Sequence, residues 1–182
     1  MALDWNTLLL DQIDFPWRGA WRPRLEGLTD EQYLWEPAPG AWSVRPRERA
    51  TTPMAAGAGE MVIDFALPEP DPPPVTTVAW RLGHVIVGVL AMRVASHFGG
   101  PPVDYATHHY AATAREALAQ LDDAYAAWTA GVREADLERP CGPAEGPYAE
   151  APMAMLVLHI HRELLHHGAE IALLLDLYRA AR

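Results

Sequence analysis

The sequence contains a single cysteine, Cys141, so no disulfide can form within the chain. Paired cysteines are typical of secreted proteins, and their absence favours a cytoplasmic location. The N-terminal segment MALDWNTLLL lacks the basic residues of a signal peptide, which agrees with that location. Cys141 lies in the turn-rich segment RPCGPAEGP, and we expect it to be an incidental surface cysteine rather than a reactive thiol.

Basic residues are also scarce, with 14 Lys and Arg against 24 Asp and Glu and a formal net charge of −10. An acidic surface repels nucleic acid, and the densest basic stretch, RPRER at 45–49, is short and includes Glu48. The longest apolar run, VIVGVLAM at 85–92, is too short to span a bilayer. We therefore expect neither a nucleic-acid partner nor a membrane partner.

Apolar residues make up 50% of the 182 residues, which suits one hydrophobic core and a single domain over 1–182. Amphipathic periodicity predicts four long helices, over about 4–25, 77–97, 112–133 and 152–182. Pro16 lies inside the first and should kink or break it, because proline lacks the amide donor and clashes with the preceding turn. The pattern predicts an all-α fold, a four-helix bundle.

A proline- and glycine-rich excursion separates the first two long helices. A short helix should follow, with Thr29 or Asp30 as its N-cap, and end before Pro37. Within 37–74, EMVIDFAL reads as a short strand that could pair with AWSVR in a hairpin. A disordered linker is the alternative, but the interleaved apolar residues favour order.

The last helix contains the most unusual stretch, HRELLHHGAEIALLLDLY at 161–178. At about 100° of rotation per residue, one face of this helix carries Leu156, Leu174 and Leu177, and we expect this stripe to face the core. His161 and Arg162 point away from it. Five polar residues fall inside or beside this stripe: His159, Glu163, His166, His167 and Glu170.

A divalent metal would compensate for burying such groups, because it binds carboxylate oxygens and neutral imidazoles together. Glu163 and His167 are four residues apart, so both can reach one ion. His84 lies in an otherwise apolar stripe of the second long helix, which includes Trp80 and Gly88. We predict a site of His84, Glu163 and His167 with open coordination positions.

Other interpretations fit the same pattern. A histidine on an apolar face is often a hydrogen-bonded core residue, and Glu163 could pair with Arg81 or Arg162. His159 and His166 could be ordinary rim residues, and the whole group could be a buried polar network without metal.

Three segments, TDEQYLWEPAPGAWSVR, TTVAWRLGHVI and HRELLHHGAEIALLLDLYR, resemble the DinB-like superfamily of metal-dependent four-helix proteins. That superfamily includes mycothiol-dependent maleylpyruvate isomerase and bacterial thiol S-transferases. The resemblance covers essentially the whole chain, although 37–74 is longer than in compact members. It implies that His84 is the metal-binding histidine of the second helix and that Glu163 and His167 are the pair on the last. Many members have histidine at the position of Glu163, and the glutamate here is similar to the arrangement in the mycothiol-dependent isomerase. Glu170 stands where relatives often have glutamine or histidine.

The resemblance implies zinc or nickel as the cofactor and a low-molecular-weight thiol such as mycothiol as cosubstrate. The implied function is a thiol-dependent transferase or isomerase that uses a metal-activated thiolate or water on a small-molecule substrate. Pocket candidates are Trp80, His159, His166 and Glu170, and no catalytic residue is assigned. The alternative is a non-catalytic, stress-associated bundle that binds a metal or ligand.

A homodimer is one further expectation. Leu158, Leu165 and Ala172 lie opposite the core stripe of the last helix and could form a subunit contact. They could equally pack under the excursion at 37–74.

Overall fold

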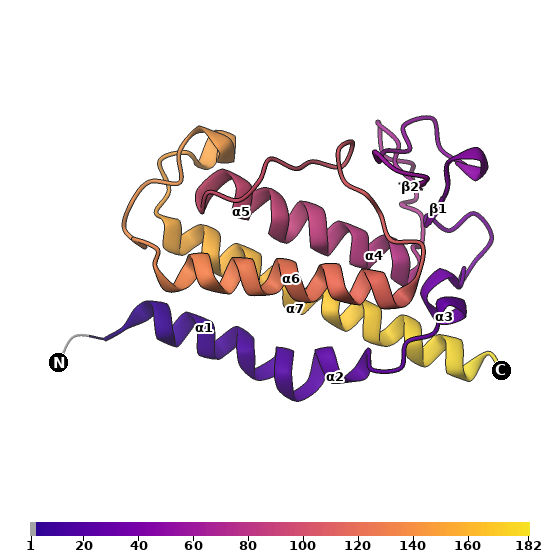
Figure 1. Ribbon diagram of the computed structural model, residues 1–182, viewed down its shortest axis with the longest axis horizontal. Coiled ribbons are helices and arrows are strands. Elements are labelled where there is room, and N and C mark those ends of the chain that lie inside the picture. The colour runs from indigo at the N-terminus through magenta and orange to yellow at the C-terminus, as the bar shows by residue number, and fades with distance from the viewer. Residues whose placement is uncertain (1–2) are drawn as a thin grey trace.

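The computed structural model describes residues 3–182 and is mostly helical, with long helical segments side by side along its long axis (Figure 1). The α-helices are α1 Trp5–Pro16, α2 Arg22–Arg24, α3 Asp30–Leu34, α4 Val78–His84, α5 Met92–His97, α6 Ala114–Arg133 and α7 Met153–Ala180. Other helical turns are the π-helical η1 Trp17–Trp21 and η3 Val85–Ala91 and the 3-10 segments η2 Arg47–Arg49 and η4 Pro143–Tyr148. The all-α expectation therefore fits broadly, with one small sheet added.

Pro16 does not break the first helical segment. The π-helical turn η1 follows it directly, and the amide of Trp17 still reaches the carbonyls of Ile13 and Asp14. A π-turn accommodates an irregular backbone hydrogen bond without ending the helix, so the chain continues to Arg24. The turn also places the rings of Trp17 and Trp21 in the core.

The second long segment runs through α4, η3 and α5 without interruption. Thr77 caps it by accepting a hydrogen bond from the amide of Trp80 at 3.1 Å. Within residues 3–182, Val78–His97 is the one helix long and apolar enough to cross a membrane by length and composition, with a mean hydropathy of 1.5. Half of this apolar window is buried inside the protein, as in a core helix.

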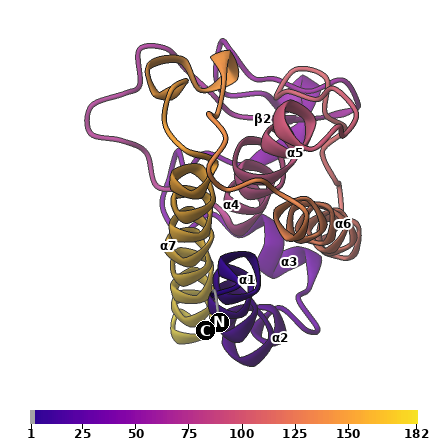
Figure 2. The ribbon, with the colours of Figure 1, turned by 90° about the vertical axis from the view of Figure 1, so that its left-hand side faces the viewer.

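Helix α7 packs on two sides. It contacts α1 and η1 on one side and α4 and η3 on the other, and the end view of Figure 2 shows α6 on the far side of these segments. The core face of α7 is therefore wider than the stripe expected from one rotation. Leu156 and Leu174 are buried as predicted, but His161 is also buried and Leu177 is 46% exposed, so those two predictions were wrong.

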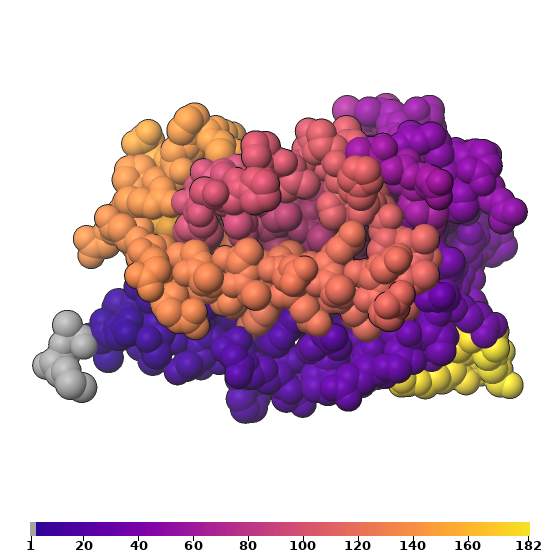
Figure 3. Space-filling model, viewed as in Figure 1, coloured from indigo at the N-terminus to yellow at the C-terminus, as the bar shows by residue number. Residues whose placement is uncertain are grey.

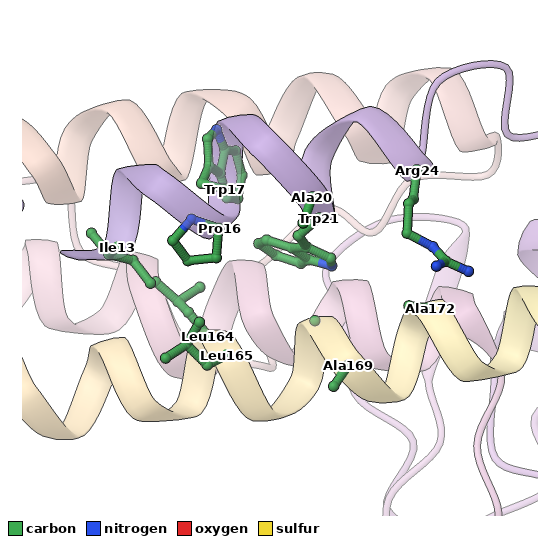
Figure 4. A pocket seen from close by; sticks show the side chains of 11 residues that line it. Ile13, Pro16, Trp17, Ala20, Trp21, Arg24, Leu164, Leu165, Ala169 and Ala172 are labelled. Carbon is green, nitrogen blue, oxygen red and sulfur yellow. The ribbon is translucent and has the colours of Figure 1, made fainter. Parts of the chain in front are cut away.

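The opposite face of α7 borders a shallow apolar hollow of about 270 Å³ (Figure 4). Leu165 and Ala172 line this hollow together with Trp21 from η1, so they do not pack under the excursion. Gly168 lies beneath the indole of Trp21, where an added Cβ would stand 3.0 Å from the ring. Close approach of η1 to α7 depends on this glycine.

The excursion between α3 and α4 is ordered. Its strands β1, Val44–Pro46, and β2, Met61–Ile63, form an antiparallel pair with Val44 opposite Ile63, which is the predicted hairpin in shorter form. Before it, α3 begins at the predicted position, and Thr29 and Gln32 form a reciprocal capping box.

Asp64 anchors the excursion from within. Its fully buried carboxylate accepts hydrogen bonds from the amide of Ser43 at 3.0 Å, Nε of Arg45 at 2.7 Å and Oγ1 of Thr51 at 3.1 Å. Its backbone carbonyl accepts from Nε1 of Trp80 at 2.8 Å. One residue thus joins both strands of the excursion to the start of α4.

Cys141 is buried rather than on the surface, which corrects the expectation for this residue. Its amide donates to the carbonyl of Ala151, so the segment around η4 closes on itself and covers the thiol. Burial raises the pKa of the Cys141 thiol, and the nearby Glu145 adds to the effect. The thiol is therefore protonated at neutral pH.

The anchoring role of Asp64 predicts a large loss of stability on truncation. Asp64→Ala removes the shared acceptor of Ser43, Arg45 and Thr51 and should lower the free energy of unfolding by about 3 kcal/mol, or Tm by roughly 6–12 °C. Asp123→Ala, at an exposed position on α6, is the matched control for loss of one aspartate. Thermal unfolding of the two variants tests this, and equal Tm values would contradict it.

Candidate metal centre

His84 and His167 meet between α4 and α7. Their ring centroids are 4.7 Å apart and the rings are nearly perpendicular. His84 is the last residue of α4, and His167 lies midway along α7, whose neighbouring turns contact α4 and η3. The structure thus brings the histidine of the second long segment to the last helix, as the sequence pattern predicted.

The two nitrogens of His167 face different carboxylates of the same helix. Nδ1 lies 2.6 Å from Oε2 of Glu170, a hydrogen bond to a group three residues along. Nε2 lies 3.6 Å from Oε2 of Glu163, four residues back. Because the Glu170 carboxylate accepts a hydrogen bond from Nδ1–H, the lone pair of the neutral ring is at Nε2, on the side of Glu163.

His84 is held by aromatic groups. Nδ1 lies 2.6 Å from Oη of Tyr105, and Trp80 stacks on the ring with centroids 5.5 Å apart. Burial lowers the pKa of His84 to about 4, and His167 and Arg81 add to this effect. The ring is therefore neutral at neutral pH, which is the form that binds metals.

Tyr105 is a hydrogen-bond partner of His84 that the sequence pattern did not reveal. Burial raises its pKa to about 12, so its hydroxyl stays protonated and can bond to His84 in either direction. The space for it comes from Gly88, one turn after His84, where a Cβ would collide with the Tyr105 hydroxyl. A glycine on the face of a candidate ligand was the available signal in the sequence.

Glu170 is already engaged by a cation. Its Oε2 lies 3.2 Å from Nε of Arg81, and the same oxygen accepts the hydrogen bond from His167. Arg81 was considered as a partner for Glu163, but it reaches Glu170 instead. Glu163 has only longer contacts, 3.6 Å to Nδ1 of His159 and 3.7 Å to Nε of Arg162. Its carboxylate is thus free of close hydrogen bonds from these neighbours.

Three side chains on α7 form the tightest group of ligand atoms. Within residues 3–182, His166, His167 and Glu170 are the group whose ligand atoms all lie within 4.8 Å of one another. His84, Glu163 and His167 do not form such a group with the side chains in these positions. The pocket candidates nevertheless all contact one of the predicted ligands: Trp80 lies on His84, His159 beside Glu163, and His166 and Glu170 beside His167.

The distances show which atoms suit a metal ion. Two ligand atoms about 2.1 Å from a tetrahedral ion lie about 3.4 Å apart. Nε2 of His167 and Oε2 of Glu163, at 3.6 Å, match this separation. Nδ1 of His167 and Oε2 of Glu170, at 2.6 Å, are instead at hydrogen-bond distance. The separation of this pair therefore suits a divalent ion on the Glu163 side of the His167 ring.

His161 belongs to a different environment on α7. It lies near Trp128, with ring centroids 6.1 Å apart, and its buried Nε2 has no hydrogen-bond partner among the described residues. Burial lowers its pKa to about 4, opposed by Asp14. This histidine is a core residue rather than a candidate ligand.

The buried His161 predicts a pH dependence of stability. In the unfolded chain its pKa returns to about 6.5, so the unfolded state binds more protons between pH 6.5 and 4. The free energy of unfolding should fall as the pH falls through this window. His161→Phe should reduce the slope of the unfolding free energy against pH by the amount that corresponds to roughly one bound proton. Urea unfolding of the metal-free protein at several pH values measures this slope. An unchanged slope would contradict the assignment.

A comparison with protein-family models matches residues 17–171 to the DinB superfamily. A search of curated proteins and a search of solved structures found no significant match. The matched range includes His84, Glu163, His167 and Glu170 and covers most of the 182 residues. The chain belongs to the DinB superfamily.

Proposed function

We propose that the protein binds one divalent metal ion through His84, Glu163 and His167, within a four-helix bundle of the DinB type. The principal support is the geometry of His167, whose Nδ1 donates to Glu170 while Nε2 lies 3.6 Å from Glu163 and the ring packs against His84. Members of the DinB superfamily commonly bind divalent metals, which agrees with this set.

The electrostatics favour this set over His166, His167 and Glu170. A dication at Glu170 would lie close to the guanidinium of Arg81, which pairs with the same carboxylate oxygen. His166 is 61% exposed on its side chain, so its imidazole would lose water contacts to bind an ion. Glu163 has no comparable cation at hydrogen-bond distance, and its charge is free to compensate the metal.

The surrounding residues would hold the ligands in place. Nδ1–H of His167 donates a hydrogen bond to Glu170, and Arg81 orients Glu170, which is a carboxylate–histidine arrangement common beside metals. Tyr105 would accept from Nδ1 of His84 and leave Nε2 for the ion, while Trp80 prevents the ring from rotating. Burial of His84 keeps it neutral without metal, so binding there displaces no proton from this ring at neutral pH.

We further propose a low-molecular-weight-thiol-dependent transferase or isomerase, located in the cytoplasm, with zinc or nickel as the ion. A divalent ion held there would lower the pKa of a coordinated thiol or water. Two neutral imidazoles and one carboxylate leave the site with a net positive charge, which favours an anionic thiolate as a further ligand. His159 and His166 would border the entry to the site. We also propose a homodimer whose subunit contact involves Leu158, Leu165 and Ala172 of α7.

The proposed ligand set predicts which variants lose metal. His84→Ala, Glu163→Gln and His167→Ala should each weaken zinc binding by more than roughly 100-fold, and Glu170→Ala by roughly 10- to 100-fold. His166→Ala is the matched control on the same helix and should keep one zinc per chain. Elemental analysis and chelator competition measure both quantities. Loss of zinc in His166→Ala with retention in Glu163→Gln would overturn the set.

The proposed chemistry predicts a metal-dependent conjugation. Zinc- or nickel-loaded protein should accelerate the reaction of mycothiol with small electrophiles, and Glu163→Gln and the metal-free protein should not. A spectrophotometric assay of thiol consumption over a panel of electrophiles measures this. If the loaded protein binds metal stoichiometrically but gives no rate above the metal-free control, it is a non-catalytic metal-binding bundle.

A further inference from the structure

A cavity of about 820 Å³ lies beside the first half of α7, between η4 and α5. Its size suits a small organic molecule. The lining combines basic and apolar groups with one acidic group, and it includes Arg93, Cys141, Glu145, Tyr148, His159 and Arg162. Three of its apolar side chains, Tyr148, Met155 and Leu158, are exposed although they line a concavity.

The one acidic group of this cavity is neutralised by the protein. Oε1 of Glu145 lies 2.8 Å from Nε2 of His97 and 3.2 Å from Nε of Arg93. The Arg93 contact is close but misaligned, because its buried Nε makes no hydrogen bond among the described residues. Glu145 therefore has little charge left to repel an anion, and Arg93 retains an unmatched donor.

Arg162 is the second cation of the cavity, and it is largely free. Its side chain is 71% exposed, and its contact with Glu163 is long, 3.7 Å from Nε to Oε1. Nη2 donates to Nδ1 of His159 at 2.6 Å, which directs the guanidinium along the cavity wall. Because guanidinium groups bind carboxylate, sulfonate and phosphate oxygens in pairs, this end of the cavity suits an anionic group.

The same end of the cavity adjoins the proposed metal centre. His159 lines the cavity, and its Nδ1 lies 3.6 Å from Oε1 of Glu163. Arg162 directly precedes Glu163 in the chain. A metal ion that binds Glu163 would compensate the negative charge of its carboxylate, so Arg162 would no longer have an ion-pair partner there. This link rests on the proposed function, whereas the cavity and its charges do not.

We propose that this cavity binds a small anionic molecule with an aromatic or aliphatic body. The anionic group lies at Arg162, next to Glu163, and the apolar body lies against Tyr148, Met155 and Leu158. The substrate or cosubstrate of the metal centre is accordingly an amphipathic anion rather than a neutral molecule or a cation. With its anionic group at Arg162, the ligand would extend along η4, which forms another part of the cavity wall.

A pair of fluorescent probes tests the charge requirement. Anilinonaphthalene sulfonate is an aromatic anion, and N-phenylnaphthylamine is its uncharged analogue. Arg162→Ala should weaken the sulfonate roughly tenfold and leave the uncharged probe unchanged, because only the sulfonate loses a charge-assisted hydrogen bond. Arg162→Lys should recover part of the affinity. Arg115→Ala removes an exposed arginine from α6 and is the matched control. Equal effects of Arg162→Ala and Arg115→Ala would overturn the proposal.

Cys141 gives an independent readout of where the probe binds. It lines the cavity and is the only cysteine in the chain, so the slow alkylation of this buried thiol by iodoacetamide, followed at about pH 9 where some thiolate forms, reports on one position. Saturating sulfonate probe should slow alkylation in the metal-free parent protein, and much less in Arg162→Ala at the same probe concentration. Unchanged alkylation at saturation would place the probe elsewhere and overturn the proposal.

The same titration in zinc-loaded protein separates the two proposals. Zinc should tighten sulfonate binding, since Glu163 no longer opposes the anion, and His167→Ala should abolish this gain but keep binding to the metal-free cavity. If zinc binds and the sulfonate affinity is unchanged, the link between cavity and metal is overturned. If no zinc binds while Arg162 and Cys141 behave as stated, the metal centre fails and the cavity stands.

Discussion

The hydrogen bond between Nδ1 of His167 and Glu170 determines the arrangement around it. At 2.6 Å it fixes one tautomer of the imidazole and directs the other nitrogen to Glu163. Glu170 also pairs with Arg81, so the same carboxylate joins α7 to α4. The interaction that orients the candidate ligand therefore also stabilises the contact between the two helices that provide the ligands.

Burial on both sides of α7 explains why its polar residues differ in character. His161 packs in the core near Trp128 and has no charged partner at hydrogen-bond distance, so burial alone dominates its pKa. His167, equally buried, has Glu170 to oppose the effect of burial on its pKa. Two buried histidines on one helix thus separate into a core residue and a residue supported as a metal ligand.

Much of this arrangement could be predicted from the sequence. Capping residues such as Thr29 and Thr77 act through neighbours three residues away, so local chemistry locates the helix starts. The pairing of His84 with His167 was also predictable, because both interrupt apolar stripes that must pack together. Figure 3 shows α6 running across one face of the molecule between α5 and α1, and its apolar side packs on these neighbours, as expected for an amphipathic helix.

The remaining features depend on contacts that no local pattern encodes. A single rotation stripe gave the wrong burial for His161 and Leu177, because α7 packs against elements on two sides. Tyr105 contacts His84 from a loop. Arg81 pairs with Glu170 rather than with Glu163, which depends on how α4 and α7 lie against each other. Cys141 is covered by a segment that closes on itself through Ala151. Each of these contacts joins segments that are packed together only in the folded chain.

The most direct measurement of the central claim is the position of zinc in crystals of the loaded protein, located by anomalous scattering at the zinc edge. The predicted result is one peak about 2.0–2.2 Å from Nε2 of His84, Nε2 of His167 and a carboxylate oxygen of Glu163, with Glu170 still on Nδ1 of His167. A peak bound by His166 and Glu170, or no peak between α4 and α7 in fully loaded crystals, would contradict it.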